Sequence, residues 1–281
     1  MILKTNVKIN LGLNVLRKRE DGFHDLETLF LPCHEYGDSL EVITGDDYSR
    51  TSAALFARYS DDQVAQGISE DGKLMITIAR EEGVDWEPLK DLCAKAYALL
   101  AKDFDLPAVK IFLEKRAPVG AGLGGGSADA AFTLRALNEL CGLGLADEAL
   151  ALYASKLGSD CAFFIFNRPM LGSGRGEILE PVDFDLEALG LQLQVLVPEG
   201  IAVSTAEAYR GVTPKEPSIR IREVLVRPSS EWKELLVNDF EASVFPEHKE
   251  LAAIKQSLYD SGAVYAAMSG SGSALFGLYQ L

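Results

Sequence analysis

The sequence predicts an α+β protein, and three observations carry that prediction. Residues 7–15 alternate between apolar and polar side chains, which is the period of a strand with one buried face. Residues 89–104 instead repeat their apolar side chains at helical spacing. Strand-like and helix-like stretches follow one another without the strict alternation of a doubly wound sheet. The length of 281 residues suits roughly two domains or one large one.

The same two periods assign the remaining elements in chain order. Turns are expected at 21–25 and at the glycine-rich stretch 171–177. Further strands are expected at 40–43, 73–79, 108–117, 161–166 and 191–197. Further helices are expected from Ala131 to near Gly142, and over 147–158, 204–211 and 246–262, with Gly158 as a C-cap and Ser204 or Thr205 as an N-cap. The chain closes with a small-residue loop between two strand-like pieces, over 266–279.

Composition excludes several classes of partner. A formal net charge of −15 repels nucleic acid and anionic lipid, and no apolar run is long enough to span a bilayer. The first ten residues lack the apolar segment of a signal peptide. The four scattered cysteines form no C-x-x-C pair, so we expect reduced thiols in a cytoplasmic protein. We also expect a monomer or a weak homodimer.

A glycine-rich loop is the strongest local signal. Five glycines lie within the seven residues from Gly120 to Gly126, between an expected strand and an expected helix. Glycines at this density let successive N–H groups point inward, and Ser127 at the helix start adds a hydroxyl. The loop therefore predicts an anion site for the phosphates of a nucleotide. The structural alternative is a tight strand-to-helix turn packed against the protein itself.

Other nucleotide-binding motifs fit less well. Gly120, Gly122 and Gly125 have the spacing of a dinucleotide-binding loop, but that fold needs a second parallel strand after the helix, and here a second helix follows. The lysine-containing P-loop pattern is absent, as are the H-R-D and D-F-G motifs of protein kinases. A dinucleotide-dependent oxidoreductase is therefore disfavoured.

The motifs resemble those of the GHMP kinase superfamily, small-molecule kinases that include galactokinase, homoserine kinase and mevalonate kinase. Residues 118–131 are similar to its phosphate loop, residues 8–15 to its first motif and residues 269–277 to its third. Within the superfamily, the stretches "DGFHDLETLF", "YGD", "LGSDCAFFIF", "GSGRGEILEPV" and "NDFE" resemble the branch that phosphorylates a cytidylated methylerythritol. The resemblance spans nearly the whole chain, with its motifs in order.

The resemblance implies a fold and a reaction. The fold has two α+β domains, an N-terminal domain over 1–155 with the glycine loop and a C-terminal domain over 156–281, with the active site in the cleft between them. The reaction transfers the γ-phosphoryl group of ATP to the 2-hydroxyl of the methylerythritol unit, in the non-mevalonate route to isoprenoids, with Mg²⁺ as cofactor. One alternative is a GHMP-type kinase for another small alcohol, such as homoserine, mevalonate or a sugar. Another is a non-catalytic sensor on the same fold, which would not need Lys8 and Asp160.

The resemblance also implies site residues. Lys8 and Asp160 correspond to the catalytic pair. The cytidylated substrate would contact Asn10, Phe23, His24, Thr205 and Tyr209, with Phe23 stacked on the cytosine and His24 reading its edge. ATP would bind the loop formed by Pro118, Val119, Gly120, Ala121, Gly122, Leu123, Gly124, Gly125, Gly126, Ser127 and Ala128.

These residues also have structural alternatives. Lys8 and Asn10 could face water from the polar side of their strand, and Asp160 could cap a turn or helix. Phe23 and Tyr209 could be core aromatics. Cys161, beside Asp160, is expected to be a buried, inert thiol. The branch usually has Val-Pro where this chain has Cys161-Ala162, and losing the proline frees an N–H just after Asp160.

Overall fold

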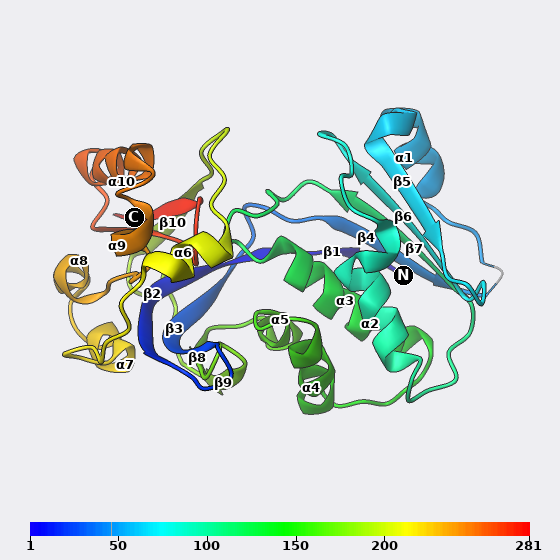
Figure 1. Cartoon of the computed structure of the whole chain (residues 1–281), viewed down its shortest axis with the longest axis horizontal. Coiled ribbons are helices and arrows are strands. Elements are labelled where there is room, and N and C mark those ends of the chain that lie inside the picture. The colour runs from blue at the N-terminus through cyan, green and yellow to red at the C-terminus, as the bar shows by residue number, and fades with distance from the viewer. Residues whose placement is uncertain (46) are drawn as a thin grey trace. The chain divides into compact units, whose positions relative to one another are not determined.

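A computed structural model describes residues 1–45 and 47–281. The chain divides into two compact units, each gathered from separate stretches of sequence. Unit 1 comprises Met1–Val7, His34–Ala117 and Gly125–Asn167, and unit 2 comprises Lys8–Cys33, Pro118–Gly124 and Arg168–Leu281. Both units combine helices with sheets, which confirms the α+β prediction (Figure 1). The family domain boundary expected between 155 and 156 stays a prediction.

Unit 1 is built on a five-stranded sheet with the strand order β1-β4-β7-β6-β5. Neighbouring strands pair antiparallel except β6 and β7, which are parallel. Leu40 lies opposite Leu113 and Val42 lies opposite Ile111, so the alternate apolar residues of β4 and β7 share one face. The five strands are β1 (Ile2–Lys4), β4 (Ser39–Thr44), β5 (Val64–Ile68), β6 (Leu74–Arg80) and β7 (Val109–Lys115).

Helices cover both faces of this sheet. Leu55 of α1 packs in a cluster with Ile43, Ala79 and Phe112, which come from three different strands. Helices α2 and α3 lie along the opposite side of the sheet (Figure 1). The helical segments of unit 1 are α1 (Ser52–Arg58), α2 (Leu92–Leu100), α3 (Gly125–Leu140), α4 (Asp147–Leu157), α5 (Cys161–Phe166) and the 3₁₀ turns η1 (Asp61–Gln63) and η2 (Pro88–Lys90).

The expectation of a strand at 161–166 is wrong, because Cys161–Phe166 forms helix α5. This helix packs against α3 and α4, and Phe163 and Phe164 are fully buried. Asn167 ends it in the left-handed conformation, with φ at 48°. A run of six apolar residues is buried equally well as a strand or as a helix, so its periodicity could not separate the two.

Unit 2 contains a four-stranded sheet of order β2-β3-β8-β9 and a three-stranded antiparallel sheet of order β10-β12-β11. Strand β3 was not expected. The turn predicted at 21–25 ends earlier in the structure, because His24 already begins this strand. The strands are β2 (Val7–Lys18), β3 (His24–Cys33), β8 (Met170–Ser173), β9 (Ile178–Pro181), β10 (Leu191–Leu196), β11 (Tyr265–Met268) and β12 (Leu275–Gln280).

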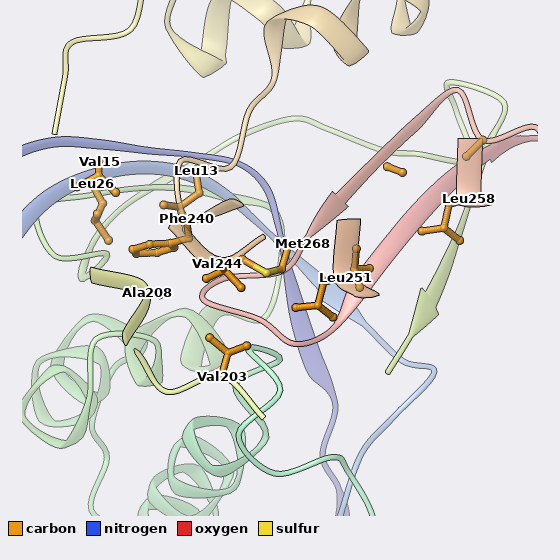
Figure 2. Packing of buried hydrophobic residues seen from close by; sticks show 13 residues of the cluster. Leu13, Val15, Leu26, Val203, Ala208, Phe240, Val244, Leu251, Leu258 and Met268 are labelled. Atoms are coloured by element: carbon orange, nitrogen blue, oxygen red, sulfur yellow. The ribbon is translucent and has the colours of Figure 1, made fainter. Parts of the chain in front are cut away.

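A cluster of thirteen buried apolar residues forms a core of unit 2, and Figure 2 shows how its side chains meet. It joins Leu13 and Val15 of β2 to Phe240, and to Leu251 and Leu258 of α10. The helical segments of this unit are α6 (Thr205–Gly211), α7 (Ile221–Leu225), η3 (Ser229–Glu231), α8 (Trp232–Leu235), α9 (Glu241–Val244) and α10 (Lys249–Asp260).

Strand β2 is longer and more deeply buried than its alternation suggested. Its residues are buried on both faces from Val7 to Val15, and Lys8 and Asn10 are each only 2% exposed. The alternative in which Lys8 and Asn10 simply face water is therefore wrong.

No helix among the described residues is long and apolar enough to cross a membrane. The same part of the chain contains no disulfide, and Cys33, Cys93 and Cys161 are buried thiols. The cytoplasmic location stays a prediction.

The burial of α5 gives a stability prediction. We expect Phe164→Ala to destabilise the protein by about 3–5 kcal/mol, because it leaves a cavity among α3, α4 and α5. The matched control is Phe56→Ala, since Phe56 on α1 is 55% exposed and its loss should change stability by about 0.5 kcal/mol or less. The measurement is the urea midpoint of unfolding. Equal midpoints for the two variants would contradict the buried helix.

Candidate active site

Three stretches that lie far apart in sequence meet within unit 2. They are the start of β2, the loop segment 118–124 and the loop after β11. The backbone N–H of Lys8 donates to the carbonyl of Leu123 at 2.9 Å, and that of Ala274 donates to the carbonyl of Ala121 at 3.0 Å. The three motifs singled out in the sequence are therefore adjacent in the fold.

The backbone of the glycine loop touches the loop after β11 with no room for a side chain. A Cβ on Gly122, where φ is +76°, would lie 2.2 Å from the carbonyl oxygen of Ser269. A Cβ on Gly270 would lie 3.1 Å from the carbonyl oxygen of Gly122. Part of the glycine content therefore serves packing within the protein, as the structural alternative supposed.

Lys8 is held by both the strand and the loop. Its Nζ donates to the carbonyl of Gly122 at 2.7 Å and to Oδ1 of Asn10 at 2.5 Å. The Asn10 amide in turn donates to Oγ1 of Thr28 at 3.0 Å. These bonds fix the position of a buried ammonium group beside the glycine loop.

The last residues of the loop, Gly125 to Ala128, form the first turn of α3 and belong to unit 1. Ser127 is the third residue of this helix, whereas the sequence had suggested that it begins the helix. The first N–H groups of a helix have no partner within it, and the helix dipole is positive there. Gly126 is exposed, and a Cβ on it would meet only Cδ1 of Leu92, at 3.9 Å. The turn therefore offers bare N–H groups to an anion.

Asp160 directly precedes α5 and is half-buried. Its side chain makes no hydrogen bond that caps the helix, so the helix-capping alternative is not supported, while the turn alternative is untested. A Cβ on Gly158 would lie 3.2 Å from Sγ of Cys161 and 4.0 Å from Oγ of Ser127, so this turn lies beside the first turn of α3. Unit 1 therefore places Asp160 next to the helical end of the glycine loop.

The two residues that replace the family's usual Val-Pro fit their positions. Cys161 is fully buried, as expected, and burial raises the pKa of its thiol to about 12. Its backbone N–H donates to the carbonyl of Gly158. Ala162 is the second residue of α5, a position in the first turn that proline also tolerates. Alanine and proline are therefore both compatible with the first turn of α5.

The predicted substrate residues form two separate aromatic contacts in unit 2. His24 stacks on Tyr209 with ring centroids 4.8 Å apart, and Tyr209 packs edge-on against Phe240 at 4.7 Å. Phe23 is 52% exposed, and the guanidinium of Arg175 lies 4.8 Å from its ring centre. Arg175 had not been predicted, although a basic residue in a glycine-rich turn was a visible signal.

Burial lowers the pKa of His24, and the charge of Lys18 lowers it further. The imidazole is therefore neutral at pH 7 and offers one donor and one acceptor. Thr205, at the start of α6, is exposed, and its Oγ1 lies 3.3 Å from Oγ of Ser271. Ser204, rather than Thr205, is the N-cap of α6, because its hydroxyl accepts the N–H of Glu207.

The fold and these contacts define a small-molecule kinase of the GHMP class. Residues 91–168 match the family model of the GHMP kinases N terminal domain, and residues 222–280 match that of GHMP kinases C terminal. Solved structures of a homoserine kinase from Cytophaga hutchinsonii, at 18% identity and a TM-score of 0.63, and of a mevalonate kinase, at 13% and 0.64, share the fold.

Proteins with higher sequence identity to this chain identify the family within the GHMP class. A Bacteroides fragilis protein named 4-diphosphocytidyl-2-C-methyl-D-erythritol kinase is 47% identical over 99% of this chain and 92% of its own length. Its namesake from Bacteroides thetaiotaomicron is 44% identical over 100% and 92%. A crystal structure of 4-(cytidine 5'-diphospho)-2C-methyl-D-erythritol kinase has 31% identity and a TM-score of 0.74, and covers 99% of this chain and 90% of that chain. The chain therefore belongs to the 4-diphosphocytidyl-2-C-methyl-D-erythritol kinase family, and as a kinase of this ATP-dependent class it uses ATP as co-substrate.

The open space at Gly126 gives a test of phosphate binding. We expect Gly126→Ala to leave stability unchanged or to raise it by up to about 1 kcal/mol, because glycine is unfavourable in a helix. We expect the same change to weaken ATP binding about tenfold or more, because the new methyl group blocks the approach of phosphate to the backbone. Calorimetric titration with ATP and thermal unfolding measure the two effects. ATP affinity equal to that of the wild type would contradict a phosphate site at this turn.

Proposed function

We propose that the protein transfers the γ-phosphoryl group of ATP to the 2-hydroxyl of 4-diphosphocytidyl-2-C-methyl-D-erythritol. The observation that carries this choice of substrate is the group of His24 and Tyr209, with Phe23 and Arg175 on the same unit. Recognition of a cytidine base requires aromatic rings that stack on it and a side chain that hydrogen-bonds to its edge. Homoserine, mevalonate and sugars have no base and require neither. The names of the relatives that match over the full chain support the same substrate.

The proposed reaction forms a bond from the substrate oxygen to the γ-phosphorus and breaks the bond from that phosphorus to the β–γ bridging oxygen of ATP. The hydroxyl proton passes to the carboxylate of Asp160, and ADP leaves. Lys8 would neutralise charge on the transferring group, because phosphoryl transfer depends on alignment and charge neutralisation more than on covalent chemistry. The loop 118–128 would hold the ATP phosphates through its N–H groups.

Magnesium is part of this proposal. Among the described residues no cluster of three His, Cys, Asp or Glu side chains suits a metal ion. Magnesium in kinases needs no such cluster, because phosphate oxygens and water supply most of its ligands, together with one or two protein oxygens. The hydroxyl of Ser127 and the carboxylate of Asp160 are oxygens of this kind in unit 1. When bound, the ion would neutralise charge on the phosphates.

The rival within the class is a kinase for another small alcohol. An assay of ATP-dependent ADP release with 4-diphosphocytidyl-2-C-methyl-D-erythritol, homoserine, mevalonate and galactose separates the two. We expect turnover with the cytidylated alcohol alone, and turnover with one of the others would overturn the proposed substrate. The monomeric or weakly dimeric state also stays a prediction.

The aromatic residues give a prediction on substrate affinity. Base stacking on an aromatic ring contributes about 1–3 kcal/mol. We therefore expect Tyr209→Ala to raise the KM for the cytidylated substrate about ten- to a hundredfold, and Phe23→Ala to behave likewise, with little effect on the KM for ATP. Tyr209→Phe keeps the ring and serves as the control, with a KM near that of the wild type. If the KM for ATP rises instead, these aromatic residues bind ATP rather than the cytidylated substrate.

The catalytic pair gives a prediction on rate. General bases contribute about 10²–10⁴-fold, so kcat of Asp160→Asn should fall by at least that order while both KM values change little. Lys8→Ala should also lower kcat. The double variant should lose less than the product of the two effects, because both residues would act on the same phosphoryl transfer. The measurement is single-turnover phosphoryl transfer at saturating substrates.

The matched control for this rate is Asp105→Asn, which removes a carboxylate from an exposed position of unit 1. Its rate should equal that of the wild type. A rate for Asp160→Asn within about threefold of wild type would remove Asp160 from the mechanism, since even a modest base contributes more than that.

A further inference from the structure

Unit 1 contains a buried charge cluster that the proposed chemistry does not use. It consists of Asp38, Lys115 and Asp129, whose side chains are 0%, 5% and 2% exposed, and we call it the Asp38–Lys115–Asp129 triad. Nζ of Lys115 donates to Oδ2 of Asp129 at 2.7 Å and also to Oδ2 of Asp38. Thr5 joins the two carboxylates, because its Oγ1 donates to Oδ1 of Asp129 and accepts the backbone N–H of Asp38, each at 3.0 Å.

The triad is bonded to the chain at both ends of the glycine loop. Oδ1 of Asp38 accepts the backbone N–H groups of Arg116 at 2.6 Å and of Ala117 at 2.7 Å, the two residues that directly precede the loop at Pro118. Asp129 follows the last loop residue and lies in α3, whose first turn completes the loop. One lysine therefore links the strand that enters the loop to the helix that leaves it.

The first residue of α3 also rests on the triad. A Cβ on Gly125 would lie 3.4 Å from Cβ of Ala117, 3.7 Å from Oδ2 of Asp38 and 3.7 Å from Nζ of Lys115. The start of α3 therefore lies directly against the triad and the residue that follows Arg116, at van der Waals distance.

The charges of the triad are costly to bury, which indicates a purpose beyond stability. Burial by itself lowers the pKa of Lys115, but the carboxylates of Asp129 and Asp38 raise it on balance, so the lysine stays charged. Burial raises the pKa of Asp129, whereas the charge and the hydrogen bond of Lys115 lower it. Buried ion clusters add little net stability compared with apolar packing, and the bonds of this one join separate stretches of the chain around the glycine loop.

We propose that the Asp38–Lys115–Asp129 triad positions the glycine loop for ATP, with Asp38 as the positioning residue that fixes the loop's entry. The inference rests on the proposed function, since it assumes that the loop binds the ATP phosphates. The triad acts through the backbone of residues 116 and 117 and through the start of α3. It should therefore govern ATP affinity and leave affinity for the alcohol substrate unchanged.

The test compares Asp38→Ala with Asp38→Asn. The alanine variant releases both backbone N–H groups, whereas asparagine keeps an oxygen that can accept them. We expect the Kd and the KM for ATP to rise at least tenfold in Asp38→Ala and by a smaller factor in Asp38→Asn, which keeps the acceptor for the two N–H groups but replaces the oxygen that accepts from Lys115. The KM for the alcohol should stay within twofold in both. Thr5→Val is a milder change that removes the link between the carboxylates, and it should weaken ATP binding about threefold. It remains informative if Asp38→Ala does not fold.

The matched control is Asn138→Ala. The Asn138 side chain also bonds two backbone groups, the N–H and the carbonyl of Leu145, but it lies towards the other end of α3. It should lower the unfolding temperature without changing ATP affinity. ATP affinity within twofold of wild type in both folded Asp38→Ala and Thr5→Val would overturn the inference. A wild-type protein that binds no ATP would instead overturn the proposed function, so the two failures are distinguishable.

Discussion

The close approach of two backbones at Gly122 is the constraint on which unit 2 depends. The Gly122 carbonyl accepts hydrogen bonds from Nζ of Lys8 and from Oγ of Ser269. No side chain fits at Gly122, because an added Cβ would lie 2.2 Å from the facing loop, and a Cβ at Gly270 would be crowded at 3.1 Å. The same contact therefore places the first strand, the glycine loop and the loop after β11 in one cluster, and it explains why two of these three stretches are rich in glycine.

Each unit holds the glycine loop through one buried lysine. In unit 2, Lys8 bonds the carbonyl of Gly122. In unit 1, Lys115 bonds the carboxylates of Asp38 and Asp129 at the two ends of the loop. A buried ammonium group requires such partners, because transfer of an unpaired charge out of water is very unfavourable. The two lysines have different surroundings and, on our interpretation, different tasks, one at the transferring phosphoryl group and one in positioning.

The aromatic contacts on which the proposed choice of substrate depends lie in unit 2. Solved structures of homoserine and mevalonate kinases share the fold at 18% and 13% identity, so the fold alone does not define the substrate. The stacked rings of His24 and Tyr209 and the contact of Arg175 with Phe23 are side-chain features on that common frame. The lowered pKa of His24 keeps its ring neutral, which suits hydrogen bonding to the edge of an uncharged base.

The sequence by itself determined the α+β class, strands such as β2, β4 and β7, helices such as α2, α4 and α10, and the glycine loop with its following helix, because these depend on local periodicity and on glycine density. It misjudged Cys161–Phe166, since six apolar residues are buried in either conformation and only the neighbouring helices α3 and α4 select the helix. It also treated Lys8 and Asn10 as possible surface residues, because burial of the polar side of β2 depends on what packs over it. Only the tertiary structure decided that Asp38, Lys115 and Asp129 meet, since the bonds that join them span 77 and 14 residues and no local pattern encodes such a contact.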